Sequence, residues 1–405
     1  MNTVDIPSPK QSVTVSSAIF WGPVLLAFFS LITLGWLDNA RGPLYPQILE
    51  GLSLSHVQGG AFFAVASFMA VIANFLVPTL LKYFSSVSTL LIGLVCTMIF
   101  VVGLSFSTCF EILIGAAVFF GLALGIIMVT INIVIEEFVP KSKQRSFLSV
   151  MHSLYGLAAF LSPLLIGYIL AWPIKWSNAF LPILFVSVPL FIFGVWQCLR
   201  VKKGQVPSAG VVSEVGLSAD LMVTHKKEVL IFWSLFLACY VSSELYFSTR
   251  LTILYQEGLG QNLELSRKFL SFFFLGLFVG RVINSVLPVK VSGKSIIMLS
   301  LLTSLIWLIF CIVFEPTWIW FMGFLMAPVY PVTVSEIAKQ AGHEFKKISA
   351  MASAVSSFVV VIMHMLAGVI ADEWGLKNSM YIPVCFLILG LGLVVTNWPR
   401  LDFSK

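Results

Sequence analysis

Charged residues are scarce in this sequence of 405 residues: Asp, Glu, Lys and Arg make up 10% of it, whereas 59% is hydrophobic. Soluble domains carry about 25% charged residues, so the chain lacks the polar surface that a water-soluble fold requires. Its mean hydropathy of +1.00 agrees. The composition excludes a soluble domain as the fold of the chain, and it makes each ionisable side chain inside an apolar run a candidate for function.

Signatures of enzymatic or metal chemistry are also missing. The six cysteines occur singly, without CxxC or metal-ligand spacing, so we interpret them as small apolar side chains. There is no GxSxG, HExxH or Walker motif. We therefore expect no enzyme, no ATP-driven pump, no metal and no cofactor. A receptor or scaffold would carry a sizeable soluble domain, and we find no segment of that kind.

Apolar runs of about 20 residues recur along the chain, and each can cross the roughly 30 Å hydrocarbon layer. They predict an all-α polytopic membrane protein with about 12 transmembrane helices, because a β-barrel would show short alternating segments instead. The first six spans are at 18–43, 57–81, 88–106, 110–138, 147–171 and 178–199. The second six are at 228–251, 269–287, 295–314, 317–337, 348–371 and 376–396.

The basic residues between these spans predict the orientation. Roughly seventeen fall on one side of the membrane and roughly six on the other. The six on the poorer side are Arg41, Lys175, Arg250, Arg267, Lys268 and Lys377. Cytoplasmic loops are rich in Lys and Arg, so we expect a cytoplasmic (inner) membrane protein with both termini in the cytoplasm. This asymmetry also explains the formal net charge of +6 without a nucleic-acid partner.

The chain divides into two similar halves. We expect a cytoplasmic tail at 1–16, a six-helix bundle at 17–200, a cytoplasmic linker at 201–227, a second six-helix bundle at 228–398 and a tail at 399–405. Acidic span ends recur about 200 residues apart, at Glu136-Glu137 and at Glu336, each followed by basic residues. Repeated halves of this kind hold a solute between them near the membrane midplane and rock around it.

Five segments carry a family resemblance. They are Leu37-Asp38-Asn39, His152-Ser153-Leu154-Tyr155-Gly156, Tyr240-Val241-Ser242-Ser243-Glu244, Phe278-Val279-Gly280-Arg281 and Ala327-Pro328-Val329-Tyr330-Pro331. They resemble segments of the first, fifth, seventh, eighth and tenth helices of the fucose/glucose/galactose–proton symporter branch of the major facilitator superfamily. The resemblance implies two pseudo-symmetric six-helix bundles and transport by alternating access. It also implies a small solute and protons as partners of a monomer in the lipid bilayer.

Two carboxylates are candidates for proton coupling. Asp38 ends the first apolar run, where burial favours its protonated form and nearby Arg41 favours its ionised form. The alternative is a residue at the end of a helix, beside a turn at Arg41-Gly42-Pro43. Glu244 lies deep in the seventh span. It either exchanges a proton or forms a static buried ion pair with Arg281.

Polar side chains in other spans are candidates for contact with the solute. They are Asn39, Arg41, Asn132, His152, Tyr155, Arg281, Asn284 and His364. Arg281 could anchor an anionic solute. For His364 the alternative is a hydrogen bond between helices. We expect ion pairs that close a cytoplasmic gate to involve Glu136, Glu137, Arg145, Glu336 and Lys347.

The sequence thus predicts a secondary active transporter that imports a small polar solute with protons. The alternative is a proton-antiport exporter of a drug, metabolite or siderophore, because the same transport mechanism can move the solute and the proton in opposite directions. The solute stays open among sugars, organic acids, nucleosides and siderophores.

Overall fold

The computed structural model describes residues 19–201, 224–286, 291–341 and 345–401, and within these ranges it contains helices and no strand. The first group of helices is α1 (Trp21–Leu52), α2 (His56–Tyr83), α3 (Ser86–Ser105), α4 (Phe110–Phe138), α5 (Lys141–Ile169) and α6 (Leu184–Val201). The second is α7 (Thr224–Ile253), α8 (Leu263–Val286), α9 (Gly293–Val313), α10 (Met322–Met326), α11 (Val329–Ala341), α12 (Phe345–Trp374) and α13 (Tyr381–Leu401). The predicted all-α class is confirmed.

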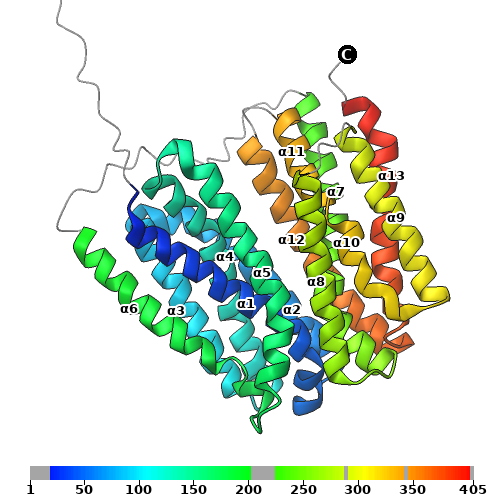
Figure 1. Ribbon diagram of the computed structural model, residues 1–405, viewed down its shortest axis with the longest axis horizontal. Helices are drawn as coiled ribbons and strands as arrows, with labels where there is room; N and C mark the ends of the chain where they lie inside the picture. The colour runs from blue at the N-terminus through cyan, green and yellow to red at the C-terminus, as the bar shows by residue number, and fades with distance from the viewer. Residues whose placement is uncertain (1–18, 202–223, 287–290, 342–344, 402–405) are drawn as a thin grey trace, which may run out of the picture.

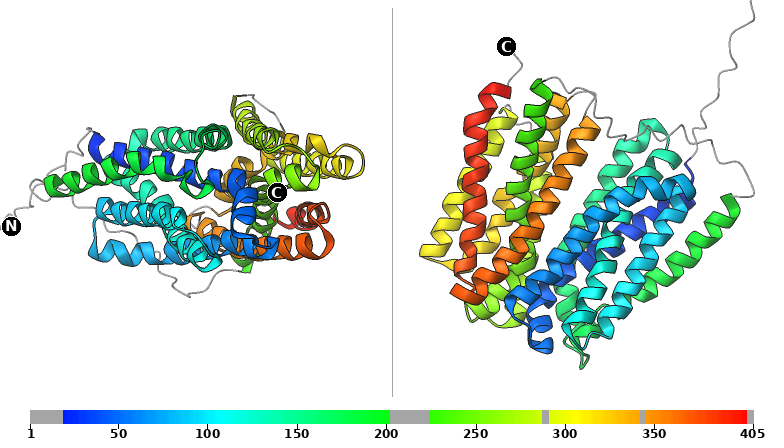
Figure 2. Two further views of the ribbon diagram at one scale, coloured as in Figure 1. Left: turned by 90° about the horizontal axis from the view of Figure 1, so that it is seen from below. Right: turned by 180° about the vertical axis from the view of Figure 1, so that it is seen from behind.

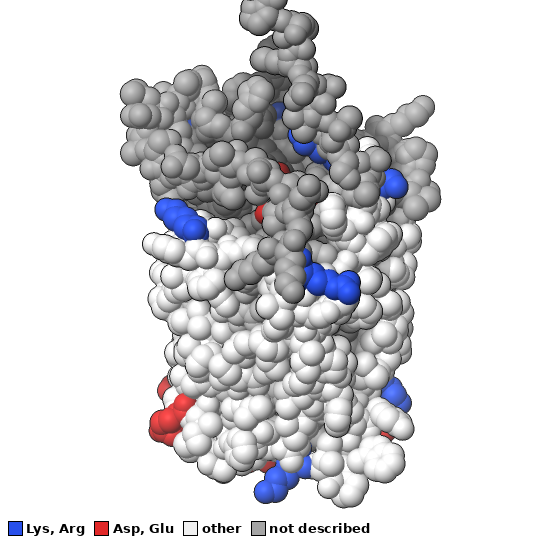
Figure 3. Space-filling model, turned by 90° about the vertical axis from the view of Figure 1, so that its left-hand side faces the viewer, with Lys and Arg blue, Asp and Glu red and all other residues white. Residues whose placement is uncertain are grey.

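Eleven helical segments in the described ranges are long and apolar enough to cross a membrane. Helix α8 is a further helix of 24 residues, and it carries four charged residues, Glu264, Arg267, Lys268 and Arg281. Figure 3 shows uncharged atoms between two charged ends of the molecule. The chain is therefore a multi-pass membrane protein with close to the predicted number of spans.

The first helix runs further than the sequence predicted. We expected the span to end at residue 43, yet α1 continues through Pro43 and Pro46 to Leu52. Proline is tolerated in membrane helices where packed neighbours and local adjustments satisfy the freed backbone groups. Helix α8 packs against this part of α1, with Arg267 donating to the carbonyl oxygen of Pro43 at 3.2 Å. Asp38 therefore lies in the interior of a 32-residue helix and not at its end.

The tenth crossing is broken, whereas the sequence predicted one continuous span. It begins with the 3₁₀ segment η4 (Pro316–Phe321), continues as α10, and resumes as α11 after a turn at Ala327 and Pro328. Pro328 and Pro331 cannot donate backbone hydrogen bonds to the preceding turn. We call this interruption between α10 and α11 the hinge.

The helices form two groups, each around its own core. The first core is built from buried residues of α1 to α6, together with Ile253 of α7. The second core is built from buried residues of α7 to α13, together with Ala159 of α5. Figures 1 and 2 show the two groups side by side, close together at one end and apart at the end where the C-terminus lies. The predicted linker at 201–227 lies almost wholly outside the described residues, so those bundle boundaries stay a prediction.

Small residues set the closest packing inside the first group. Helices α2 and α4 run against each other, and a Cβ atom on Gly121 would lie 2.2 Å from the carbonyl oxygen of Ala66. One turn later, a Cβ atom on Gly125 would lie 2.4 Å from the carbonyl oxygen of Ala70. Pairs of small residues four apart let membrane helices approach backbone to backbone.

Three of the basic residues that the sequence assigned to outer loops are buried instead. Arg41, Arg250 and Arg267 expose 6%, 1% and 6% of their surface. They belong to helices α1, α7 and α8 and find partners inside the protein. Their removal from the loops widens the difference in basic charge between the two ends.

Candidate functional site

Asp38 sits in a buried cluster in the first group. Its carboxylate is paired with Arg41 one turn later on α1, and it accepts a hydrogen bond from the hydroxyl of Tyr155 on α5 at 2.5 Å. The Arg41 guanidinium lies over the Phe120 ring at 4.1 Å and near Phe63 at 5.2 Å. Cation–π contacts of this kind stabilise a desolvated guanidinium. The arrangement holds a carboxylate and its counter-ion within the hydrophobic interior.

Tyr155 also fixes how α5 meets α1. About two turns after Tyr155 on α5, Ser162 donates to the carbonyl oxygen of Trp36 at 2.9 Å. Gly35 faces the Tyr155 ring, which a Cβ atom at that position would approach to 2.9 Å. The sequence predicted Tyr155 as a solute contact, and in the structure its hydroxyl bonds to Asp38.

Glu244 forms the corresponding cluster in the second group. One carboxylate oxygen contacts the hydroxyl of Tyr240, one turn earlier on α7, and the other lies 3.2 Å from the guanidinium of Arg281 on α8. Tyr330 of α11 is close enough to interact electrostatically with both charges. The Arg281 side chain is 40% exposed and that of Glu244 is 21% exposed, whereas Arg41 and Asp38 expose 8% and 17%. The second cluster is thus the more accessible of the two.

A set of hydrogen bonds joins the two groups at one end, and we call it the latch. Asp372 at the end of α12 accepts from the backbone N–H groups of His56 and Val57 at the start of α2, both at 2.8 Å. Arg250 of α7 donates to the hydroxyl of Tyr45 on α1 at 3.4 Å, and it also holds the carbonyl oxygen of His364 in its own group at 2.8 Å. Arg267 of α8 donates to Gln47 of α1 at 2.6 Å.

Two glycines bring α2 and α12 together inside the latch. A Cβ atom on Gly60 would lie 2.6 Å from the carbonyl oxygen of His364. A Cβ atom on Gly368 would lie 2.6 Å from the carbonyl oxygen of His56. Backbone atoms cannot move aside as a flexible side chain can, so the close approach depends on both glycines.

The sequence reasoning missed the latch almost entirely. Asp372, His56 and the two glycines lie at span ends, where a charge or small residue is ordinary. The one signal was the acidic residue Asp372 at the end of an apolar span, followed by Gly375. Which helix start it would face depends on tertiary packing.

The other predicted solute residues fall in different places. His364 is 2% exposed, stacks on the ring of Phe63 at 5.3 Å and belongs to the latch. Asn39 is buried and donates to the carbonyl oxygen of Gly35 at 2.8 Å. Asn132 and His152 are exposed, and Asn284 is partly exposed. The structure therefore brings Asn39, Arg41 and Tyr155 to Asp38 and brings Arg281 to Glu244. His364 borders the Asp38 cluster through Phe63, whose ring contacts both His364 and Arg41.

The structure describes the side chains of three of the five residues that the sequence assigned to a cytoplasmic gate. Glu137 accepts a hydrogen bond from Ser86, and Glu336 is paired with Lys339, one turn later, at 2.6 Å. Glu136 is exposed on α4. The side chains of Arg145 and Lys347 lie outside the described residues, so the role of these five residues stays a prediction.

Two helical groups with charged residues buried between and within them form the fold of a multi-pass membrane transporter. The family model for the Major Facilitator Superfamily matches residues 24–347, and the chain belongs to this superfamily. The predicted superfamily is confirmed, while the similarity to the fucose/glucose/galactose branch is a loose one.

Two curated proteins illustrate the relationship. The chain is 23% identical over 405 residues to Bypass of stop codon protein 6 of Saccharomyces cerevisiae, covering 91% of this chain and 80% of that protein. It is 26% identical over 181 residues to the Hexuronate transporter of Bacillus subtilis, covering 44% of this chain and 41% of that protein.

Solved structures share the fold at low identity. A D-xylose-proton symporter superposes with a TM-score of 0.76 at 12% identity, covering 95% of this chain and 99% of that chain. The nucleoside transporter NupG superposes with a TM-score of 0.73 at 10% identity, covering 94% of this chain and 100% of that chain.

The latch yields a first prediction. Asp372→Asn keeps the size of the side chain but removes the charge that faces the positive end of α2. A charge at a helix N-terminus contributes about 0.3–1 kcal/mol where it is exposed, and Asp372 is exposed. The ratio of latch-open to latch-closed protein should therefore rise up to about fivefold, as measured by distances between spin labels at positions 50 and 377. Glu373→Gln, on the same exposed turn, should leave these distances unchanged; an equal change in both variants would contradict the assigned role of Asp372.

Proposed function

We propose that this protein is a proton-coupled importer of a small polar solute, and that Asp38 and Glu244 are its proton-coupling residues. One observation carries the proposal: in each half a carboxylate lies inside the hydrophobic interior with an arginine and a tyrosine as its partners. Ionisable residues at such depth are costly and are typical of proton relays and solute paths. We propose transport, and no enzymatic reaction, as its activity.

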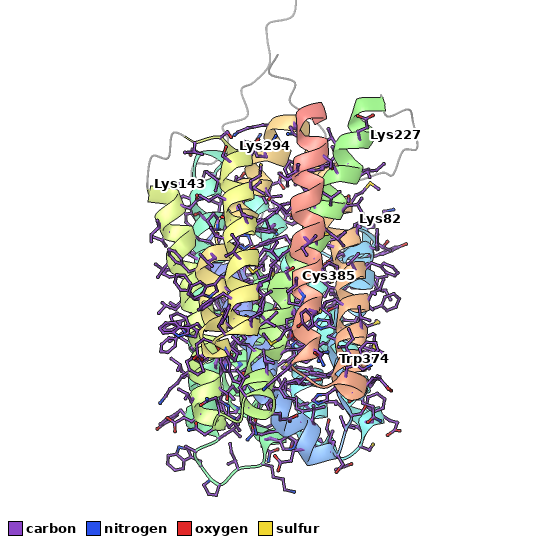
Figure 4. The ribbon with its side chains drawn as sticks, turned by 90° about the vertical axis from the view of Figure 1, so that its right-hand side faces the viewer. Lys82, Lys143, Lys227, Lys294, Trp374 and Cys385 are labelled. Atoms are coloured by element: carbon purple, nitrogen blue, oxygen red, sulfur yellow. The ribbon has the colours of Figure 1, made fainter. Side chains whose placement is uncertain are left out.

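The described conformation supports alternating access around this pair of clusters. The latch closes one end of the interface, while the helices of the two groups lie apart at the opposite end. Figure 4 shows Lys82, Lys143, Lys227 and Lys294 at that opposite end, with Trp374 near the latch. The excess of basic residues favours the cytoplasm for the open end, so the conformation is one that would release solute inward.

The solute class that we propose is a sugar-sized carboxylate. Arg281 is the most exposed of the clustered arginines, and a guanidinium binds a carboxylate through paired hydrogen bonds. The partial similarity to a Hexuronate transporter supports the same class. A carboxylate that competes for Arg281 would loosen its pair with Glu244, which links solute binding to the proton site.

Thermal unfolding of the purified protein tests this assignment. Glucuronate and galacturonate should raise the midpoint, whereas glucose, xylose and uridine should not, at pH 5.5 and 7.5. Arg281→Gln should lose most of this response, about 1.5–3 kcal/mol of binding, since it removes a charge-assisted hydrogen bond. Lys268→Gln is the control, because its charge lies on the same helix but pairs with Glu264 at the exposed end. Stabilisation by a neutral sugar or nucleoside alone would contradict the proposed solute class.

A further inference from the structure

Tyr240 touches two acceptors that belong to different helices. Its ring is almost fully buried, with 1% of its surface exposed. Its hydroxyl contacts one carboxylate oxygen of Glu244, and it also lies 3.2 Å from the carbonyl oxygen of Met326. A phenol carries a single donor hydrogen, so Tyr240 can donate to only one of the two at a time.

The second acceptor lies at the break in the tenth crossing. Met326 is the last residue of α10, and the turn at Ala327 and Pro328 follows it. Pro331 has no N–H group, so the carbonyl group of Ala327 cannot complete its helical hydrogen bond there. A hydrogen bond from α7 to this place would tie the hinge to the helix that carries Glu244.

Three ionisable side chains interact with Glu244 among the described residues. Arg281 comes from α8, Tyr330 from α11 and Tyr240 from α7 itself. When Glu244 is ionised it can only accept, so Tyr240 and Arg281 both donate to it. When Glu244 is protonated it becomes a donor, and Tyr240 can accept from it and turn its own hydrogen to the Met326 carbonyl oxygen.

We propose that Tyr240 is a positioning residue that transmits the protonation state of Glu244 to the hinge between α10 and α11. With Glu244 ionised, the hinge is released from α7. With Glu244 protonated, the end of α10 is bound to α7 through Tyr240. The proposal rests on the proposed role of Glu244 as a proton site, and it adds the element that moves when the proton arrives.

Distances between α7 and α11 test the proposal without any solute. Spin labels at positions 227 and 339 report on the two helices at the same end, in a background without Cys109, Cys198 and Cys385, which are the cysteines that are not buried. The parent protein should show a distance distribution that changes between pH 5.5 and 8.0. Tyr240→Phe should abolish this change, because it removes the hydroxyl and keeps the ring.

Two further variants separate the possible outcomes. Glu244→Gln should hold the low-pH distribution at both pH values. Tyr246→Phe removes another buried hydroxyl of α7, one that contacts Ser379 at 2.5 Å, and it should behave like the parent. If Tyr240→Phe keeps the pH response while Glu244→Gln loses it, the switch through Tyr240 is overturned and the proton site stands. If Glu244→Gln also keeps the response, or the parent shows none, both are overturned.

If Tyr240→Phe does not fold, an unnatural amino acid at the same position tests the proposal instead. Difluorotyrosine at position 240 keeps the hydroxyl and makes it a stronger donor to ionised Glu244. The midpoint pH of the distance change should then move to lower pH, because the ionised form is favoured. An unmoved midpoint would overturn the proposal.

Discussion

The Asp38→Asn variant is expected to lose all accumulation of solute against a gradient and to lose about 3–5 kcal/mol of stability. The loss of stability follows from the ion pair, since removing one partner leaves a buried charge uncompensated. Here the remaining charge would be Arg41, whose side chain is 8% exposed and lies over Phe120. The loss of accumulation follows from the absence of a group that can bind and release a proton.

A double variant separates these two effects. Asp38→Asn combined with Arg41→Gln removes both charges and should recover most of the stability, measured by thermal unfolding in detergent. Uptake into energised vesicles should stay at background for glucuronate or galacturonate, whichever of the two stabilises the parent protein in thermal unfolding. Tyr155→Phe is the matched control, because it removes the other partner of Asp38 and keeps the titratable group. Accumulation restored in the double variant would reduce Asp38 to a structural role.

The Gly368→Ala variant is expected to open the latch. The added methyl group would meet the carbonyl oxygen of His56 at 2.6 Å and the Cα atom of Val57 at 2.7 Å. Overpacking costs about 1–3 kcal/mol, and here only the latched conformation is overpacked. A difference of this size changes the ratio of two conformations about 5–150-fold.

Distances at both ends of the molecule measure this shift. Labels at positions 50 and 377 should move apart at the latch, and labels at 82 and 227 should approach at the other end. Gly115→Ala is the control, because a Cβ atom there meets nothing within 4 Å. If Gly368→Ala changes neither distance, the two groups do not separate along the contact of α2 with α12.

The membrane class, the all-α fold and the approximate number of spans could be predicted because hydropathy is a local property. Each run of apolar residues favours insertion into the membrane independently of the sequence around it. The same reasoning singled out Asp38, Glu244 and Arg281, since a charge inside such a run stands out. It misjudged the end of α1, because Pro43 usually ends a helix and only the packed neighbours allow it to continue.

The partners of these charges were decided by tertiary structure alone. Asp38 meets Tyr155 across 117 positions of the chain, and Arg250 meets His364 across 114. Charges assigned to loops, such as Arg267, are buried where two helices meet. The sequence by itself determined which segments enter the membrane, because the free energy of transfer from water into the membrane is a sum over the residues of each segment. Only the folded structure decided which segments lie together, because an ion pair or a close glycine contact depends on both partners at once.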